Sequence, residues 1–169
     1  MDINAIKQRL NALQSTNNTG KKEKIDYNGF IFIGLMNVKG NPYVIEYNVR
    51  MGDPETQVVI PRLKNDLLDI IIKSLNNNLK DVEIKFHKNF ATTVILASKG
   101  YPENYKKGEV INNLIENKNS NIFHAGTKVK GNKVLSNGGR VIACTGYGNN
   151  LYEALNNSYE IANNVSWVS

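Results

Sequence analysis

Three polar residues alternate with apolar ones in a stretch rich in β-forming residues: Glu46, Asn48 and Arg50. A β-strand sends alternate side chains to opposite faces, so these three would share one face. They suit a magnesium–phosphate site, because carboxylate and amide oxygens are hard ligands for Mg²⁺ and a guanidinium can hold an oxygen of a phosphoryl group in transfer. The pattern leaves an alternative open, a solvent-facing strand edge with a Glu–Arg pair.

The loop that follows this strand shifts the balance toward a functional site. Within residues 52–57 it combines two acids with a glycine and a proline, namely Gly52, Asp53, Pro54 and Glu55. Loops that are held by rigid elements often carry catalytic or binding residues.

The elements that would position these residues are predicted from periodicity and composition. Residues 30–36 and 43–49 are β-branched and aromatic and flank a turn at 39–42, which predicts a hairpin. An amphipathic helix should follow, and its apolar stripe consists of Leu67, Leu68, Ile71, Ile72, Leu75 and Leu79.

A second group of short strands begins near residue 86. Strands are expected at 92–97, 122–125, 133–135 and 139–144, with glycine turns between them. A last helix should start at Asn150, which has capping-box spacing to Glu153. Its predicted buried side consists of Leu151, Leu155, Ala162 and Val165. The expected fold class is therefore α+β.

The chain is predicted to have three parts. Residues 1–24 combine a short helix, with apolar residues at helical spacing, and a polar linker. Residues 25–84 hold the hairpin and first helix, and residues 85–169 hold the remaining strands and last helix. The boundary between the latter two parts is expected between Leu79 and Phe90.

Composition narrows the classes of function. The 21 basic and 15 acidic residues give a net charge of +6, but the lysines are spread along the chain, which is more typical of a solvated surface than of nucleic-acid binding. No apolar run approaches the roughly 20 residues that span a bilayer, and the N-terminus has no signal-peptide pattern. The single cysteine, Cys144, excludes a disulfide within the chain and is expected to be a small buried hydrophobe. These features favour a cytoplasmic protein.

Several motifs, taken in order, resemble one enzyme family. The stretch from Val44 to Gln57, followed by Pro61-Arg62-Leu63, is similar to the end of the ATP-grasp domain of phosphoribosylamine–glycine ligases. The likeness extends from about Tyr27 to Trp167 and includes Gly100-Tyr101-Pro102, Tyr105-Lys106-Lys107-Gly108, Phe123 to Lys128 and Asn137-Gly138-Gly139-Arg140. The resemblance implies the C-terminal end of an ATP-grasp domain followed by a small α+β C-terminal domain.

The resemblance also implies a reaction. The family joins glycine to 5-phosphoribosylamine in purine biosynthesis, with ATP as co-substrate and a glycyl phosphate intermediate. Glu46 and Asn48 match the family's ligands for Mg²⁺ or Mn²⁺, and Arg50 would sit on the transferred phosphoryl group. Among the further site residues, Asp53 would hold an ammonium, and the others would line the substrates: Pro54, Glu55, Lys128 and Arg140.

Purely structural roles remain an alternative for some of these residues. His124 can be a structural histidine in a strand. Gly138-Gly139 can be a plain hairpin turn followed by a solvated Arg140, and residues 100–102 can form a turn without a functional role.

The complete ligase of this family is longer and begins with domains that bind phosphoribosylamine and the nucleotide. We therefore expect that the chain works with a complementary N-terminal half and shows no activity alone. Residues 1–24 do not resemble what precedes the hairpin in the family. The alternative reading is a non-catalytic remnant or binding module, tethered to DNA through the basic head.

Overall fold

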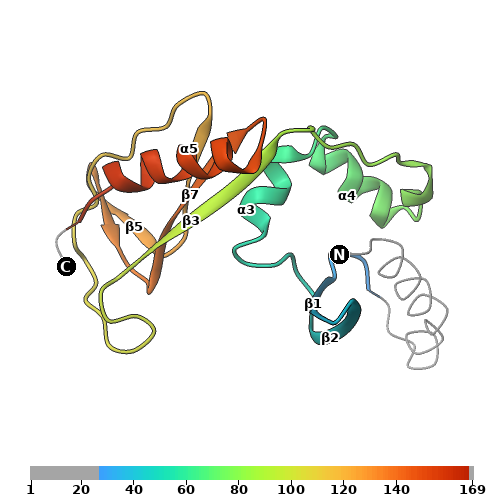
Figure 1. Ribbon diagram of the computed structural model, residues 1–169, viewed down its shortest axis with the longest axis horizontal. Helices are drawn as coiled ribbons and strands as arrows, with labels where there is room; N and C mark the ends of the chain where they lie inside the picture. The colour runs from blue at the N-terminus through green and yellow to red at the C-terminus, as the bar shows by residue number, and fades with distance from the viewer. Residues whose placement is uncertain (1–26, 168–169) are drawn as a thin grey trace. The chain divides into compact units, whose positions relative to one another are not determined.

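The computed structural model describes residues 27–167 (Figure 1). The predicted helix and linker of residues 1–24 lie outside the described residues. The chain divides into two compact units. The first includes residues up to Gly52 together with Leu67–Glu83, and the second combines Asp53–Asp66 with Ile84–Ser169.

The first unit contains the predicted hairpin. Strands β1 (Phe32–Val38) and β2 (Asn41–Asn48) pair antiparallel, as expected. The turn between them uses Lys39 and Gly40, both with positive φ (50° and 87°), a combination that suits the right-handed twist of a hairpin. The pairing shifts between Gly34 and Leu35, so that Ile45 of β2 is an extra residue on its strand, which is the arrangement of a β-bulge.

The helix of the first unit is shorter than predicted. Helix α4 (Leu67–Leu75) ends before Asn77, whose φ of 59° is the left-handed conformation common at helix ends, and a 3₁₀ turn, η2 (Leu79–Asp81), follows. The predicted apolar stripe is wrong, because Ile70 is the buried residue of the helix, whereas most of the predicted stripe is exposed: Leu68, Ile71, Ile72, Leu75 and Leu79.

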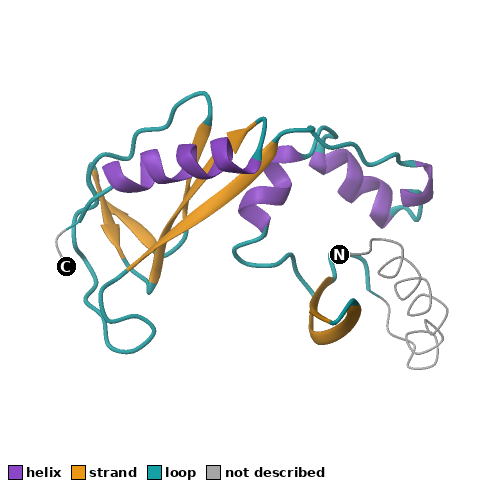
Figure 2. Ribbon diagram, viewed as in Figure 1, coloured by secondary structure: helices purple, strands orange, loops and turns teal. Residues whose placement is uncertain are grey.

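The second unit is built on a three-stranded antiparallel sheet (Figure 2). The strand order is β3 (Phe90–Ala97), β7 (Arg140–Gly148), β4 (Ser120–His124), and β5 (Thr127–Lys130) pairs with β6 (Lys133–Ser136) as a separate hairpin. The unit also contains helices α3 (Thr56–Val59), η1 (Ile60–Arg62) and α5 (Leu151–Asn164). The expected strands are all present, and β5 is the strand that the sequence did not predict.

Helix α5 begins as the sequence predicts. Asn150 is its N-cap and accepts a hydrogen bond from the Glu153 backbone N–H (2.9 Å), while the Glu153 side chain accepts one from the Asn149 N–H (2.8 Å). The two bonds satisfy backbone donors that a helix start would otherwise leave unpaired.

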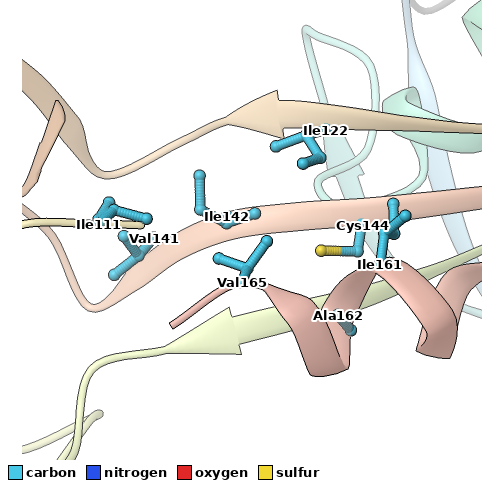
Figure 3. Close-up of a cluster of buried hydrophobic side chains, with 8 residues drawn as sticks. All are labelled: Ile111, Ile122, Val141, Ile142, Cys144, Ile161, Ala162 and Val165. Atoms are coloured by element: carbon cyan, nitrogen blue, oxygen red, sulfur yellow. The ribbon is translucent and has the colours of Figure 1, made fainter. Parts of the chain in front are cut away.

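The core of the second unit lies between α5 and the sheet (Figure 3). Strand β7 is central and contributes Val141, Ile142 and Cys144, all with no exposed surface, which confirms the expectation for the cysteine. The other core residues are Ile111, Ile122, Ile161, Ala162 and Val165.

The predicted buried side of α5 is half wrong. Leu151 and Leu155 are exposed, whereas Ala154 and Ser158 are fully buried. The reason is close packing: a Cβ on Gly146 of β7 would overlap the helix backbone at Ala154 and Ser158. Only small side chains fit on the helix face that approaches the strand this closely.

None of the helices in residues 27–167 is long and apolar enough to cross a bilayer.

Candidate functional site

Glu46 and Asn48 lie two residues apart on β2 of the first unit. Glu46 is paired with Gly34 and Asn48 with Phe32 on β1. A Cβ on Gly34 would come within 2.9 Å of Glu46 Cγ, so glycine at this position leaves room for the carboxylate arm to lie across the hairpin. Glu46 is exposed and Asn48 half-buried. Their alternation on the strand places both oxygen-bearing side chains on one face.

Arg50 lies two residues beyond the end of β2. Its guanidinium Nη1 donates to the carbonyl of Met51 at 3.1 Å, which folds the side chain back along the chain. The apolar residues that alternate with these polar ones, Ile45, Tyr47 and Val49, are exposed as well. The strand ladder therefore fixes the relative direction of Glu46 and Asn48, and the bend after it places Arg50.

Glu46 and Asn48 have the donor chemistry of a Mg²⁺ site. Within the described part of the chain, no group of three or more His, Cys, Asp or Glu side chains comes together to hold a metal ion. Magnesium does not require such a group, because it commonly takes one or two protein oxygens and completes its shell with water and substrate phosphates. One carboxylate and one amide oxygen fit that role, and Mn²⁺ accepts the same ligands.

The second unit brings together two residues that the sequence predicted separately. Arg140 Nη2 donates to Asp53 Oδ2 at 2.8 Å, across 87 positions of sequence. The side chains are 41% and 50% exposed, so both charges remain reachable from solvent. The ion pair brings into contact two residues that the sequence predicted for the site from separate motifs, and their roles stay predictions.

Helix α3 holds the Asp53 loop against the sheet. Thr145 Oγ1 on β7 donates to the carbonyl of Gln57 (3.2 Å), and the carbonyl of Glu55 accepts from the backbone N–H of Val59 (3.0 Å). Glu55 is the N-cap of α3 and is exposed, and Pro54 is half-buried. Asp53 is therefore carried by a loop whose far end is tied to the central strand.

Close-packed glycines hold the turn before Arg140. A Cβ on Gly126 would come within 2.6 Å of the Gly138 Cα, and a Cβ on Gly139 would overlap the ring of Tyr101. The Gly126 N–H also donates to the Arg140 carbonyl (2.9 Å). The turn is thus a packed part of the structure, and larger residues cannot replace its glycines without movement of backbone.

Lys128 and His124 lie two residues on either side of Gly126, the glycine that packs against this turn. Lys128 is exposed on β5, paired with Leu135, two residues beyond Gly126. His124 is exposed, and its Nδ1 lies 3.1 Å from Thr127 Oγ1, a contact that fits a structural histidine.

A cavity of about 580 Å³ borders the same turn and was not predicted. It is lined by residues 98–100, 104–106 and Glu109. Sequence reasoning treated residues 100–102 as a turn, and the Glu103 N–H does close one onto the Gly100 carbonyl (2.9 Å).

Two groups of the second unit have raised pKa values. Burial raises the pKa of the Cys144 thiol to about 11, so the thiol is protonated at neutral pH and is no nucleophile. Burial, and to a smaller extent the charge of Glu116, raises the pKa of Tyr147 to about 12.

Two family models match the chain. Residues 91–169 match the family model of the phosphoribosylglycinamide synthetase C domain, and residues 3–56 match that of the ATP-grasp (A) domain of the same synthetase. The chain belongs to this family and corresponds to its C-terminal part. The match from residue 3 corrects the expectation that residues 1–24 are unrelated to the family.

Individual relatives of this synthetase segment are much longer than the chain. This chain is 43% identical to the phosphoribosylamine–glycine ligase of Vibrio cholerae over 144 residues, and the match covers 83% of the chain and 34% of that ligase. It is also 43% identical to a bifunctional purine biosynthetic protein of Dictyostelium discoideum, covering 92% of the chain and 20% of that protein. The crystal structure of the Thermotoga maritima ligase superimposes with a TM-score of 0.74 at 37% identity, over 87% of the chain and 36% of the ligase.

The match to the family confirms the predicted α+β architecture, an ATP-grasp end followed by a C domain. The predicted division between residues 84 and 85 stays a prediction. The compact units of the structure are cut differently, because they group residues 53–66 with the C-terminal part.

Proposed function

We propose that this chain forms part of a phosphoribosylamine–glycine ligase, which uses ATP to join glycine to 5-phosphoribosylamine through glycyl phosphate. The supporting observation is the Asp53–Arg140 ion pair, because it unites the loop and the turn that carry the predicted substrate-binding residues. Membership of the synthetase family supports the reaction class.

Each residue of the proposed site has a role set by its chemistry. Asp53 offers its remaining carboxylate oxygen to a substrate ammonium, since Arg140 occupies only Oδ2. Arg140 and Lys128 bind the substrate phosphate, and a planar guanidinium can contact a phosphate and a carboxylate on different edges. Pro54 and Glu55 line the substrates beside them.

Glu46 and Asn48 would hold Mg²⁺ or Mn²⁺, which neutralises phosphate charge when bound. Arg50 would bind the transferred phosphoryl group, where its interaction strengthens as charge develops. ATP is the co-substrate, and a complementary N-terminal ligase half is the expected partner. The reaction is proposed to be cytoplasmic.

A chimaera tests this proposal. The aligned third of the Vibrio cholerae ligase would be replaced by residues 27–169 of this chain, and glycine-dependent ADP release with phosphoribosylamine would be measured. We expect activity in the chimaera and none in the isolated 169-residue chain, because phosphoryl transfer depends on a positioned nucleotide.

Single substitutions in the chimaera test the residues. Glu46→Gln should raise the Mg²⁺ concentration needed for half-maximal rate. Arg50→Lys should lower kcat more than it raises KM, by on the order of 10²-fold, the cost of one electrostatic contact in a transition state. Arg140→Met should mainly raise KM for phosphoribosylamine. Lys118→Ala, an exposed charge change elsewhere, is the control. Unchanged kinetics in all three variants would show that the site is misassigned.

A further inference from the structure

The pairing between β3 and β7 shifts by one residue near the start of β7. Leu96 lies opposite Ile142. The next residue of β3, Ala97, lies opposite Arg140, so Val141 is an extra residue on β7. One extra residue on one strand of an antiparallel pair is a β-bulge, and bulges are frequent beside active sites, where they re-aim a side chain.

The hydrogen bonds on the other edge of β7 place the irregularity at the same residue. In a regular strand, the carbonyls of consecutive residues point to opposite edges. The carbonyls of Arg140 and Val141 instead both accept from the segment that follows β4. The donors are the N–H groups of Gly126 (2.9 Å) and Ala125 (3.0 Å). The bulge is therefore visible in the pairing with both neighbouring strands.

Beyond the bulge, the side chains of β7 alternate regularly between two faces. Ile142 and Cys144 belong to the core cluster that lies between the sheet and α5 (Figure 3). Thr145 lies on the opposite face, where its hydroxyl donates to the Gln57 carbonyl (3.2 Å). The strand thus has one core face and one face toward residues 53–57.

The alternation is offset before the bulge. Val141 belongs to the same core cluster as Ile142, although the two are consecutive. Arg140 is therefore turned to the other face, where its guanidinium reaches Asp53 at 2.8 Å. Arg140 and Thr145 are five positions apart and both contact the segment 53–57. On a regular strand, residues an odd number of positions apart lie on opposite faces.

We infer that the bulge at Val141 turns the Arg140 guanidinium away from the core and toward the Asp53 loop, so that Val141 is a positioning residue for the candidate site. In a regular register Arg140 would share the core face of Ile142, where an unpaired charge is strongly unfavourable. The extra residue fills the core with an apolar side chain and leaves the charge on the other face. The consequence for substrate binding rests on the function proposed above, whereas the consequence for the Arg140–Asp53 contact does not.

The contact is tested first in the 169-residue chain by NMR, without any need for activity. Nuclear Overhauser effects (NOEs) report protons that lie close together. In the wild type we expect NOEs from the Arg140 side chain to Asp53, and from the Val141 methyl groups to core residues such as Ile111 (Figure 3). A wild type whose Val141 methyl groups show no NOEs to the core would overturn the inference directly.

Two variants remove the bulge in opposite ways. One alanine inserted between Leu96 and Ala97 gives Val141 a partner on β3 and restores regular alternation. The insertion should turn Arg140 to the core face and abolish its NOEs to Asp53. Deletion of Val141 also restores a regular ladder, but it leaves Arg140 on the face opposite Ile142. The NOEs to Asp53 should therefore persist in the deletion variant.

A control insertion and the amide spectrum separate these effects from general damage. One alanine inserted between Gly131 and Asn132 lengthens the turn between β5 and β6 and should leave the NOEs of Arg140 intact. Dispersion of the amide signals reports whether each variant is folded. If the β3 insertion prevents folding, the deletion variant and the wild type decide: loss of the Arg140–Asp53 NOEs in a folded deletion variant contradicts the inference.

The consequence for the site is tested in the chimaera described above. The β3 insertion should raise KM for phosphoribosylamine about tenfold, the order expected for the loss of one charge-assisted hydrogen bond, with a smaller change in kcat. Partial unfolding would instead lower kcat. In an Arg140→Met background, the same insertion should raise KM by less than about twofold more, because the side chain that it misdirects is already absent.

The inference and the proposed function fail separately. If Arg140→Met alone leaves KM unchanged, the substrate role of Arg140 is wrong, and the NOEs still decide whether the bulge directs its side chain. If Arg140→Met raises KM but a folded β3-insertion variant keeps both the wild-type KM and the Arg140–Asp53 NOEs, the bulge does not position Arg140. Equal increases in KM from the insertion with and without Arg140 would likewise reject the positioning role.

Discussion

Replacing Ser158 with alanine should destabilise the second unit although the change removes a single oxygen atom. Ser158 is fully buried on α5. Its Oγ accepts from the Gly146 N–H (2.9 Å), lies 2.6 Å from Thr92 Oγ1, and can donate to the carbonyl of Thr92 (2.9 Å) or Ala154 (3.1 Å). One hydroxyl therefore links the helix to both β3 and β7.

The magnitude follows from the groups that lose a partner. Alanine cannot accept from the Gly146 N–H, and a buried donor left unsatisfied costs about 1–3 kcal/mol. A hydroxyl has one proton, so at most one of the two carbonyl contacts adds to this loss. We expect the free energy of unfolding to fall by about 1–3 kcal/mol. Asn156→Ala, at an exposed position of the same helix, should change it by less than about 0.5 kcal/mol.

Urea unfolding followed by Trp167 fluorescence measures this effect, because the chain has one tryptophan. Trp167 is half-buried and packs against the core cluster, so it senses unfolding of the second unit. The double variant Thr92→Val/Ser158→Ala should lose less than the sum of the single variants, since their hydroxyls contact each other. A loss below about 0.5 kcal/mol for Ser158→Ala would show that the hydroxyl network does not stabilise the fold.

Three further outcomes are expected from the second unit. Gly146→Ala should destabilise it by about 1–3 kcal/mol or more, because the added Cβ overlaps the backbone of α5; urea unfolding with no loss would contradict the close approach. Iodoacetamide at pH 8 should alkylate Cys144 slowly in the folded chain and completely in urea, since burial raises its pKa to about 11; intact mass reports the adduct, and fast alkylation of folded protein would refute the burial. The pKa of Tyr147 is raised from 10.0 to about 12, so the protonated phenol contributes stability that is fully present below pH 10 and is lost as the pH rises through 12. The free energy of unfolding of wild type relative to Tyr147→Phe should therefore fall between pH 10 and 12. A difference that stays constant over this window would reject the assignment.

Local periodicity was sufficient for most of the secondary structure. The content of β-branched residues in 43–49 and in 92–97 predicted strands, and the Asn150–Glu153 spacing predicted the start of the last helix. The buried side of α5 was predicted wrongly in part, because burial there depends on how closely the helix approaches β7. Ala154 and Ser158 lie against Gly146 and are buried, whereas Leu155 does not lie on that face of α5 and is exposed although it is apolar.

The contact between Asp53 and Arg140 could not be derived from local sequence. Each residue was singled out by its own motif, but nothing in a pattern of neighbours specifies a pairing across 87 positions. The pairing follows from tertiary structure, because Thr145 on β7 holds α3 through the Gln57 carbonyl and so brings the preceding loop toward the start of the same strand.

The glycines around Arg140 fix the backbone of this part of the candidate site. An exposed ion pair such as Asp53–Arg140 contributes at most about 1 kcal/mol to stability, so it cannot hold the backbone in place by itself. Rigidity comes from contacts that need no charge: Gly126 against Gly138, and Tyr101 over Gly139. The guanidinium thus projects from a backbone that is already fixed, and its charge remains available to a ligand. In the proposed function, such preorganisation would let Arg140 bind substrate without the cost of ordering its backbone on each encounter.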